Sequence, residues 1–481
     1  MGERNNGRYI VAFEIGSSKI RGAVGVVDNS GVVDVIAVEE EKLTDRVRYG
    51  CIQNVDVANA IDTVVERLQA YPAVEPRTIT GVYVGLGGRS LTSTMVDVSM
   101  QLPVETEITE PIITELKKRA AATTDPDRDT VDVVPVRFTV DNKTQTSPVG
   151  TFGQSLSARA TVLSCSPQIK RILRRVITDR LGLNINGYIT RPLAEAAMVL
   201  TEDERRLGCM FVDFGAETTT VSVYRGGAPV YVATLPIGSR NITLDLIALN
   251  YIEERAEEIK KVSGNALAVD AARRGKGYAE GIDYTDINNY VHARADEIVA
   301  NIIAQIEYAG VTAADLPGGI VIVGGGARLR GFNELLQQQS KLPVRQGAPS
   351  ASVRITDGSI HGTEMVDVIS VLVAASRMPE AECLTPMPDN AGETPEHRGY
   401  TNYEGLTPKE GEDEGSSRIG RIDDDPDGDD PRVSSPPQKP DGDTNSGKGS
   451  RFSLVSKLQE RISRMFVDDT YFNEGQQSEE S

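Results

Sequence analysis

The N-terminal part of the chain has a hydrophobic pattern that predicts strands joined by tight turns. Three runs of apolar and β-branched residues, Tyr9–Phe13, Ala23–Val27 and Val32–Val38, are separated by turn residues, which is typical of strands joined by hairpins. The next segment, Val57–Gln69, places its apolar residues three or four positions apart. That spacing puts them on one face, so the sequence predicts an amphipathic helix there.

The later part of the chain repeats this mixture. Met210–Asp213 and Val221–Tyr224 form a second predicted hairpin, and Ile320–Val323 is a buried-type strand that ends in three glycines. Strands mixed with helices in this way indicate an α/β architecture. Between the two hairpins lies a small α+β unit. Its predicted elements are a helix at Pro111–Ala122 and strands at Val133–Val140 and Ala158–Leu163.

The two hairpins share one residue pattern. Val11–Lys19 and Met210–Thr219 each contain an apolar strand, an acid, an apolar residue, a glycine and then hydroxyl-bearing residues. The acids, Glu14 and Asp213, lie 199 residues apart. This repetition indicates a duplicated domain in which two similar loops face one cleft.

Each loop has the chemistry of a phosphate-binding turn. A tight turn at glycine lets backbone N–H groups approach a phosphate, and neighbouring hydroxyl groups add donors. An acid two residues before the glycine can hold Mg²⁺ through its water shell, because Mg²⁺ keeps several waters and takes few carboxylates. Glu14 and Asp213 are therefore the predicted Mg²⁺ residues. The simpler alternative is a pair of ordinary hairpin turns.

A third glycine-rich element follows these loops. Gly318–Leu329 contains the strand Ile320–Val323 and then Gly324, Gly325 and Gly326. Glycines between a strand and a helix leave room for a flat ring against the backbone. Close packing of a helix on a strand is the commoner reason for such glycines. They support a nucleotide site mainly through their order in the chain, because they follow two phosphate-type hairpins.

Charge and composition narrow the classes of function. The 481 residues include 51 Lys and Arg and 70 Asp and Glu, which gives a net charge of −19 and argues against a broad basic face for nucleic acid. The four cysteines are scattered and no 18 apolar residues run together, so we expect no zinc ribbon, disulfide framework or spanning helix. The first residues lack a signal-type apolar segment. We expect a soluble, cytoplasmic-type protein.

The composition changes abruptly near residue 385. Residues 385–450 hold 16 Asp and Glu against 7 Lys and Arg, with few apolar side chains, and predict a disordered acidic linker. Residues 451–467 then predict a membrane-surface helix, because seven apolar residues of Arg451–Phe466 fall within an arc of about 160° beside basic residues. A helix that docks on the core or on a partner helix is the alternative. The predicted membrane-binding residues are Phe452, Leu454, Val455, Lys457, Leu458, Arg461, Ile462, Arg464, Met465 and Phe466.

The order of phosphate loop, phosphate loop and glycine-rich element resembles that of the actin, Hsp70 and sugar-kinase superfamily. Within it, the chain resembles the FtsA family of bacterial cell-division proteins over about residues 8–378 and again at the C-terminal helix. The segments that carry this resemblance are Gly81–Gly88, Leu200–Arg205, Ile242–Ala248 and Ala256–Lys260. The resemblance implies an α/β, actin/Hsp70-like two-lobed ATPase fold with an FtsA-type inserted subdomain, then the disordered linker and the C-terminal amphipathic helix.

The resemblance also implies subdomain boundaries. These are 8–83 with 164–203 and 363–384 for the first lobe (1A), 84–163 for the inserted interaction subdomain (1C), 204–245 with 296–362 for the second lobe (2A), and 246–295 for subdomain 2B.

The resemblance further implies a site for ATP with Mg²⁺. The first loop would contact the β-phosphate, the second the γ-phosphate, and the remaining residues the ribose and adenine. The nucleotide-binding residues implied are Gly16, Ser17, Ser18, Lys19, Gly215, Thr218, Thr219, Glu257, Lys260, Gly325, Gly326 and Arg328. Spacing alone puts Glu257 and Lys260 on one helix face, where a surface ion pair is the simpler interpretation.

Three departures from the family pattern bear on hydrolysis. The first acid is Glu14 instead of Asp, and Ala216-Glu217 replaces small glycines, which would bring a negative charge toward the γ-phosphate. Related chaperones have a Glu before the proline of the connecting helix, where this chain has Arg191. We therefore expect ATP binding with weak or no hydrolysis.

The function implied by the resemblance is assembly at the division site. The protein would bind ATP, polymerise into actin-like filaments and tether the tubulin-like protein FtsZ to the cytoplasmic face of the membrane. Its partners would be the FtsZ C-terminal peptide, bound on residues 205–362, further copies of itself, anionic lipids and later division proteins. The alternatives are a pilus-assembly ATPase of the same fold and a sugar kinase-like ATP-dependent enzyme.

Overall fold

The structure is a computed structural model that describes residues 7–43, 47–52, 57–267, 284–351, 353–355 and 360–386. The predicted membrane helix and all but the first two residues of the predicted linker lie outside the described residues. Those two, Thr385 and Pro386, continue the folded part, because β19 (Leu384–Pro386) pairs with β6 (Arg77–Ile79). Within the described part of the chain, every helix is too short or too polar to cross a bilayer.

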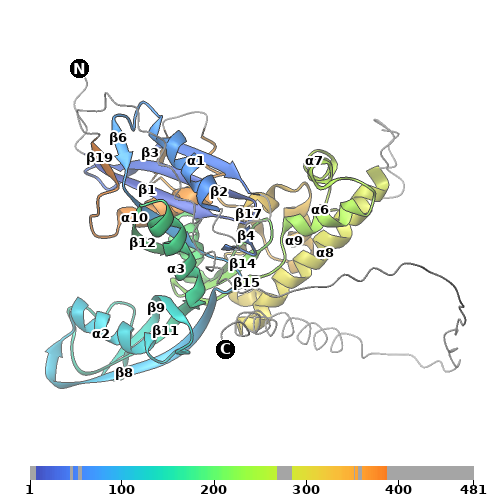
Figure 1. Cartoon of the computed structure of the whole chain (residues 1–481). Helices are drawn as coiled ribbons and strands as arrows, with labels where there is room; N and C mark the ends of the chain where they lie inside the picture. Colours follow the sequence, from blue (N-terminus) through green and yellow to red (C-terminus); the bar gives the residue numbers. More distant parts are fainter. Residues whose placement is uncertain are drawn as a thin grey trace, which may run out of the picture. The chain divides into compact units, whose positions relative to one another are not determined.

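The first lobe is built on a six-stranded sheet with helices on both sides (Figure 1). Its strands, in pairing order, are β12 (Asn184–Thr190), β7 (Gly81–Leu86), β1 (Arg8–Ile15), β2 (Lys19–Val27), β3 (Val33–Lys42) and β18 (Val353–Ile355). β1 and β2 form an antiparallel hairpin, and β7 and β12 extend the sheet in parallel. Helix α1 (Val57–Gln69) packs on β2 and β3, while α10 (Val366–Ser376) packs on β1 and α4 (Arg191–Val199).

The second lobe uses the same hairpin at the centre of a second sheet. Its strands are β13 (Cys209–Phe214), β14 (Thr219–Arg225), β15 (Ala228–Leu235), β16 (Ile320–Val323) and β17 (Val344–Gln346). Its helices are α5 (Glu202–Leu207), α6 (Ser239–Ile247), α7 (Glu253–Ser263), α8 (Tyr284–Tyr308) and α9 (Phe332–Ser340), with short turns at Ala313–Asp315 and Gly325–Arg328. As in the first lobe, the first strand pairs antiparallel with the second and parallel with a later one.

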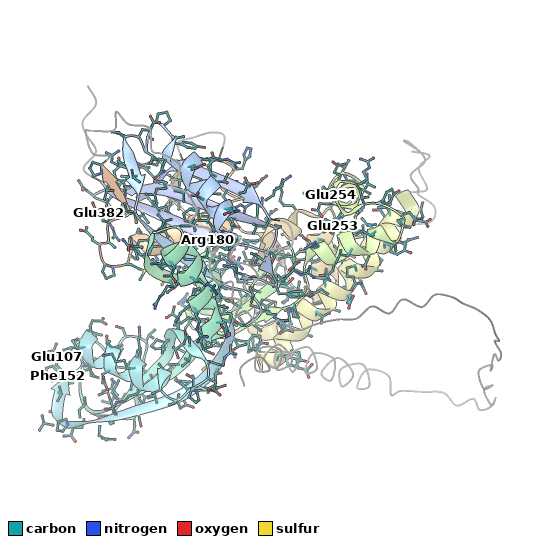
Figure 2. The ribbon with its side chains drawn as sticks, in the orientation of Figure 1. Glu107, Phe152, Arg180, Glu253, Glu254 and Glu382 are labelled. Atoms are coloured by element: carbon teal, nitrogen blue, oxygen red, sulfur yellow. The ribbon has the colours of Figure 1, made fainter. Side chains whose placement is uncertain are left out.

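The inserted unit extends the second sheet to nine strands. Its elements are β8 (Thr92–Glu107), α2 (Glu110–Ala121), β9 (Asp129–Val140), β10 (Lys143–Gln145) and β11 (Phe152–Cys165). The hydroxyl of Ser93 donates to the Val232 carbonyl at 2.9 Å and accepts from its N–H at 2.7 Å, which joins β8 to β15. Figure 2 labels Glu107 and Phe152, which pair where β8 ends and β11 begins.

Four short elements complete the first lobe. They are β4 (Val47–Arg48), β5 (Cys51–Ile52), α3 (Pro167–Leu173) and a π-helical continuation over Arg174–Arg180.

The hydrophobic pattern predicts some of these elements and misses others. The predicted strands of both hairpins are confirmed, and α1 has the predicted bounds. The long strand β8 was not predicted, because Val98 is its only buried residue and its pattern carries little hydrophobic signal. The 25-residue helix α8 was not predicted either.

Candidate functional site

The two hairpin turns have the same hydrogen-bonded geometry. In the first, the Gly16 N–H donates to the Lys19 carbonyl at 3.0 Å; in the second, the Gly215 N–H donates to the Thr218 carbonyl at 2.9 Å. The ladders that end at the turns also match, with Ile15 opposite Ile20 and Phe214 opposite Thr219. The repeated sequence pattern is therefore a repeated structure.

Both turns leave backbone donors without protein acceptors. Within the described part of the chain, the N–H groups of Ser17, Ser18, Ala216 and Glu217 make no hydrogen bond. Consecutive N–H groups in a turn form a concavity that suits an anion. Each turn thus offers two donors of the kind a phosphate needs.

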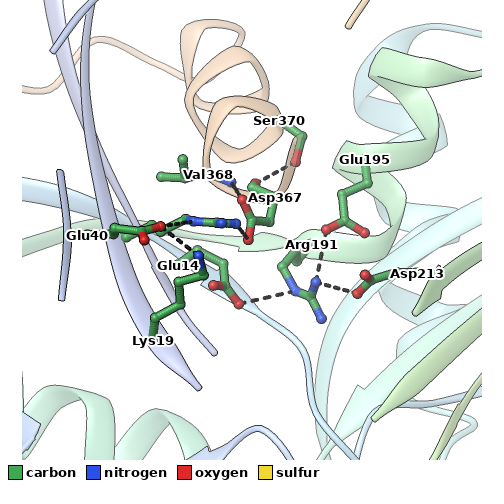
Figure 3. A network of polar contacts seen from close by, with 10 residues as sticks. Glu14, Lys19, Glu40, Arg191, Glu195, Asp213, Asp367, Val368 and Ser370 are labelled. Atoms are coloured by element: carbon green, nitrogen blue, oxygen red, sulfur yellow. Dashed lines mark hydrogen bonds and ion pairs between the residues drawn. The ribbon is translucent and has the colours of Figure 1, made fainter. Parts of the chain in front are cut away.

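Arg191 joins the acids of the two turns (Figure 3). It stands at the start of α4, and its Nε lies 3.6 Å from the Glu14 carboxylate of the first turn. Its Nη1 donates to Asp213 of the second turn at 2.5 Å and to Glu195 at 2.9 Å. All four side chains are buried. A single guanidinium therefore bridges the two lobes at the candidate site.

Burial sets the protonation behaviour of this cluster. Burial raises the pKa of Glu14 to about 7, although the charge of Arg191 acts in the opposite direction. Burial also raises the pKa of Glu195, whose Oε2 has no hydrogen-bond partner. Burial disfavours the charged guanidinium of Arg191, but Asp213, Glu195 and Glu14 together raise its pKa above the usual range. The arginine therefore stays charged, and the three carboxylates share its one positive charge.

A second cluster supports the first turn from the side. Arg21 pairs with Asp367 of α10 and lies 3.2 Å from Glu40 of β3. Glu40 also accepts a hydrogen bond from the Lys19 Nζ at 2.7 Å. The ammonium group of Lys19 is thereby held at the turn, at a partly exposed position.

A tight turn between β4 and β5 connects both hairpins. The Tyr49 N–H donates to Glu217 of the second turn at 2.7 Å, and the Gly50 N–H donates to the Ser17 hydroxyl of the first at 2.9 Å. Tyr49 and Gly50 both have positive φ, at 51° and 73°. A Cβ on Gly50 would lie 2.5 Å from the Gly88 Cα, so glycine is required at this contact.

The structure places Glu217 differently from the sequence expectation. Its carboxylate accepts from Arg240 at 2.8 Å, lies 3.6 Å from Arg48 and accepts the Tyr49 N–H. Two arginines thus hold its charge, instead of leaving it to face a phosphate. The neighbouring threonines also differ from each other, since the buried Thr219 hydroxyl donates to the Ile237 carbonyl at 2.8 Å. Thr218, with no such bond among the described residues, is the better placed of the pair.

Helix α6 links the second turn to the predicted adenosine residues. The N–H groups of Ser239 and Arg240 donate to the carbonyls of Gly215 and Ala216 at 3.0 and 2.7 Å. From α7, the Lys260 Nζ donates to the Ser239 carbonyl at 3.0 Å. The second turn and α7 therefore both contact the short helix α6.

Glu257 and Lys260 form a half-buried ion pair, in which Lys260 is buried and Glu257 is about a third exposed. Their charged groups lie 2.6 Å apart, Lys260 is only 6% exposed, and both contact the Thr243 hydroxyl. Burial raises the pKa of Glu257, but Lys260 and Thr243 overcome this and lower it to about 2. Burial lowers the pKa of Lys260, against the charge of Glu257.

The glycines after β16 serve two different purposes. At Gly326 a Cβ would lie 2.6 Å from the Phe214 ring, so close packing requires glycine there. At Gly324 the backbone has a φ of 92°, a conformation that favours glycine. A Cβ on Gly325 would meet nothing within 4 Å. Only Gly325 therefore borders open space, as a ring-binding position would. Arg328 is exposed and pairs with Glu364 at 2.8 Å.

Sequence reasoning missed the residues that hold the site together. Arg191 was noted only as the replacement of a Glu, and the Tyr49–Gly50 turn and Arg240 were not singled out. Gly50 is the one local sequence signal of a tight turn there, because glycine readily adopts the positive φ that the structure shows. Glu195 lies only four residues from Arg191. The partners in the two turns lie 22 to 177 residues from Arg191 and Arg240, which no local pattern records.

Comparisons with known proteins point to one family. A family model described as "Cell division protein FtsA" matches residues 210–370, and one described as "SHS2 domain inserted in FTSA" matches residues 88–164. The cell division protein FtsA of Porphyromonas gingivalis is 32% identical over 342 residues, which cover 68% of this chain and 70% of that protein. FtsA of Bacillus subtilis is 28% identical, over 72% of this chain and 80% of that protein.

A solved structure shares the fold more distantly. The PilM-PilN type IV pilus biogenesis complex aligns with a TM-score of 0.58 at 15% identity, covering 77% of this chain and 99% of that chain. At this identity the likeness concerns the fold alone. Together with the family matches, it confirms the predicted mixed α/β, actin-like fold with an inserted subdomain.

The buried Glu14 carboxyl predicts a pH dependence of stability. Its pKa of about 7 in the folded protein exceeds its ordinary value of 4.5, so its contribution is complete below about pH 4.5 and lost as the pH rises through about 7. We expect Glu14→Gln to reduce the loss of unfolding free energy between about pH 5 and pH 8 by on the order of 1–3 kcal/mol. Urea unfolding at the two pH values measures this loss.

Glu257→Gln is the matched control for this prediction. Because the pKa of Glu257 is lowered to about 2, its contribution to stability is lost only as the pH falls below its ordinary value of 4.5. The control should therefore show the parent's change between about pH 5 and pH 8. An unaltered change in Glu14→Gln would contradict the assignment.

Proposed function

This chain belongs to the FtsA family of cell-division proteins, and on that premise we propose that it binds ATP, forms actin-like filaments and tethers FtsZ to the membrane at the division site. One observation of the structure supports the nucleotide site most directly. Two turns with identical hydrogen bonding, one from each lobe, are joined by Arg191 and by the Tyr49–Gly50 turn. Paired donor turns suit a polyphosphate, which carries anionic groups along its length.

We place the phosphates between the turns and the nucleoside toward α7. The free N–H groups of the two turns and the Lys19 ammonium would contact the phosphates. The open side of Gly325 would receive the base, while the ion pair of Glu257 and Lys260 would border the ribose. This arrangement uses both lobes, so a bound nucleotide would stabilise their contact.

We further propose that hydrolysis is weak or absent. A general base must reach the attacking water with a carboxylate or imidazole that can accept its proton. The acids nearest the turns, Glu14, Glu195 and Asp213, are all engaged by Arg191. Glu217 is engaged by Arg240 and Tyr49. Glu195 keeps one oxygen, Oε2, without a hydrogen-bond partner among the described residues, but that oxygen is buried. None of the four acids therefore has the freedom that a base in line with the γ-phosphate requires.

The second lobe is the proposed site for the FtsZ C-terminal peptide. Large apolar side chains on this lobe remain exposed, including Leu207, Leu244, Ile252 and Val262. Ile252 immediately precedes α7 and Val262 lies in its last turn, and both are more than two-thirds exposed. Apolar side chains displayed in this way are common in protein interaction sites. Filament formation and the docking of later division proteins are proposed from the family alone.

The predicted helix at 451–467 is the proposed membrane anchor. Its basic residues border the apolar arc, where their stems can reach anionic headgroups. Arg451–Phe466 carries four basic residues and one acid, within a chain of net charge −19, so local attraction must overcome repulsion by the rest of the protein. The acidic segment at 385–450 would act as the spacer between this anchor and the folded part.

Lys19→Gln tests the phosphate site. We expect the affinity for ATP to fall by about tenfold or more, because a cation at the phosphate is lost. Lys42→Gln is the matched control, since Lys42 lies opposite Lys19 on β3 and is exposed. Isothermal titration calorimetry with ATP measures both. Equal affinities in the two variants would contradict the placement of the phosphates.

Flotation of FtsZ with anionic vesicles tests the tethering. FtsZ should float only when the full chain is added, and Leu458→Glu with Phe466→Glu should reduce the floated fraction by more than about tenfold, because the charges fall in the apolar arc. Ser453→Glu with Ser456→Glu adds the same charge outside the arc and should cost far less. Equal flotation of FtsZ by the parent and the Leu458/Phe466 variant would refute the anchor.

A further inference from the structure

The predicted Mg²⁺ residues do not fit a metal as the structure arranges them. Glu14 and Asp213 were expected to hold Mg²⁺ through water, but both carboxylates already face the guanidinium of Arg191, at 3.6 and 2.5 Å. Among the described residues, no cluster of three or more Asp, Glu, His or Cys could hold a metal. The positive charge between the turns is supplied by the chain itself.

Three features fix this guanidinium between the turns. Pro192 follows Arg191 at the start of α4, which restricts the backbone from which the side chain extends. Glu195, one turn further along the helix, accepts from Nη1 at 2.9 Å. Gly87 provides the wall on the other side, since a Cβ there would lie 3.0 Å from Nε and 3.1 Å from Nη2. The position is built for a planar cation.

One nitrogen of the guanidinium remains available. Nε and Nη1 face the acids, whereas Nη2 makes no hydrogen bond within the described part of the chain (Figure 3). A guanidinium carries five N–H donors in a rigid fork and stays charged at any physiological pH. An arginine bound to acids on one side can therefore still donate to a phosphate oxygen on the other.

We propose that Arg191 is the resident cation of the nucleotide site: it neutralises Glu14 and Asp213 in place of Mg²⁺ and presents Nη2 to a phosphate, so that ATP affinity depends only weakly on divalent metal. This inference rests on the proposed ATP site between the two turns. The physical reason is the free-energy cost of replacing the guanidinium by a metal between Glu14 and Asp213. A metal that entered between the acids would break buried ion pairs and leave the guanidinium with Glu195 as its remaining acidic partner among the described residues.

Removal of the arginine should create the metal dependence that the parent lacks. In Arg191→Gln, Glu14 and Asp213 would face each other without the guanidinium, and Mg²⁺ could take its place between the two carboxylates. Arg191→Lys keeps the charge but loses the planar fork. It should bind ATP more weakly than the parent and remain largely independent of metal.

The experiment is calorimetric titration of ATP into the full chain, in excess Mg²⁺ and in excess EDTA. We expect the parent's dissociation constants to agree within about threefold, and those of Arg191→Gln to differ by at least about tenfold. Lys19→Gln is the control for a general loss of positive charge, and should weaken ATP binding equally in both solutions.

The outcomes separate this inference from the proposed function. ATP binding by the parent that requires Mg²⁺ would overturn the role of Arg191 while leaving the nucleotide site in place. Absence of ATP binding in both solutions would overturn the site itself, and the inference with it. If Arg191→Gln does not fold, the parent and Arg191→Lys decide, since Mg²⁺ dependence in either would contradict a resident cation.

Discussion

The ion cluster around Arg191 is the interaction on which the rest of the candidate site depends. Glu14 and Asp213 come from different lobes and are both buried, and burial of like charges side by side is unfavourable without a cation between them. The guanidinium resolves this by pairing with both. Because it extends from the first helix after β12, the junction of the two lobes and the chemistry between the two turns are set by the same side chain.

A second connection extends from the turns to the inserted subdomain. The Tyr49–Gly50 turn contacts Ser17 and Glu217, and its Tyr49 carbonyl accepts the Arg89 N–H at 2.9 Å, near the start of the insert. Gly50 and Gly88 touch through their backbones, where no side chain could yield. Hydrogen bonds through the Tyr49–Gly50 turn thus connect both hairpin turns to the first residues of the insert.

The strands, the helix α1 and the two turns could be predicted from the sequence, whereas the ion pairs between distant segments could not. Strand and helix periodicity located both hairpins and α1, and the repeated acid, glycine and hydroxyl pattern located both turns. The acids of the two turns that pair with Arg191 and Arg240 could not be predicted, because ion pairs across 22 to 177 residues leave no local periodicity. Thr219 illustrates a finer limit, since strand alternation turns its hydroxyl to the Ile237 carbonyl while Thr218 stays at the turn.

Hydrogen exchange on the full chain, with and without ATP, tests the central claim that the two turns form one phosphate site. The N–H groups of Ser17, Ser18, Ala216 and Glu217 have no acceptors among the described residues, so a bound polyphosphate should supply them. Exchange should slow on ATP addition at both turns together, in the peptides that span 15–20 and 214–219. Slowing at one turn alone, or at neither while ATP is bound, would contradict a shared site.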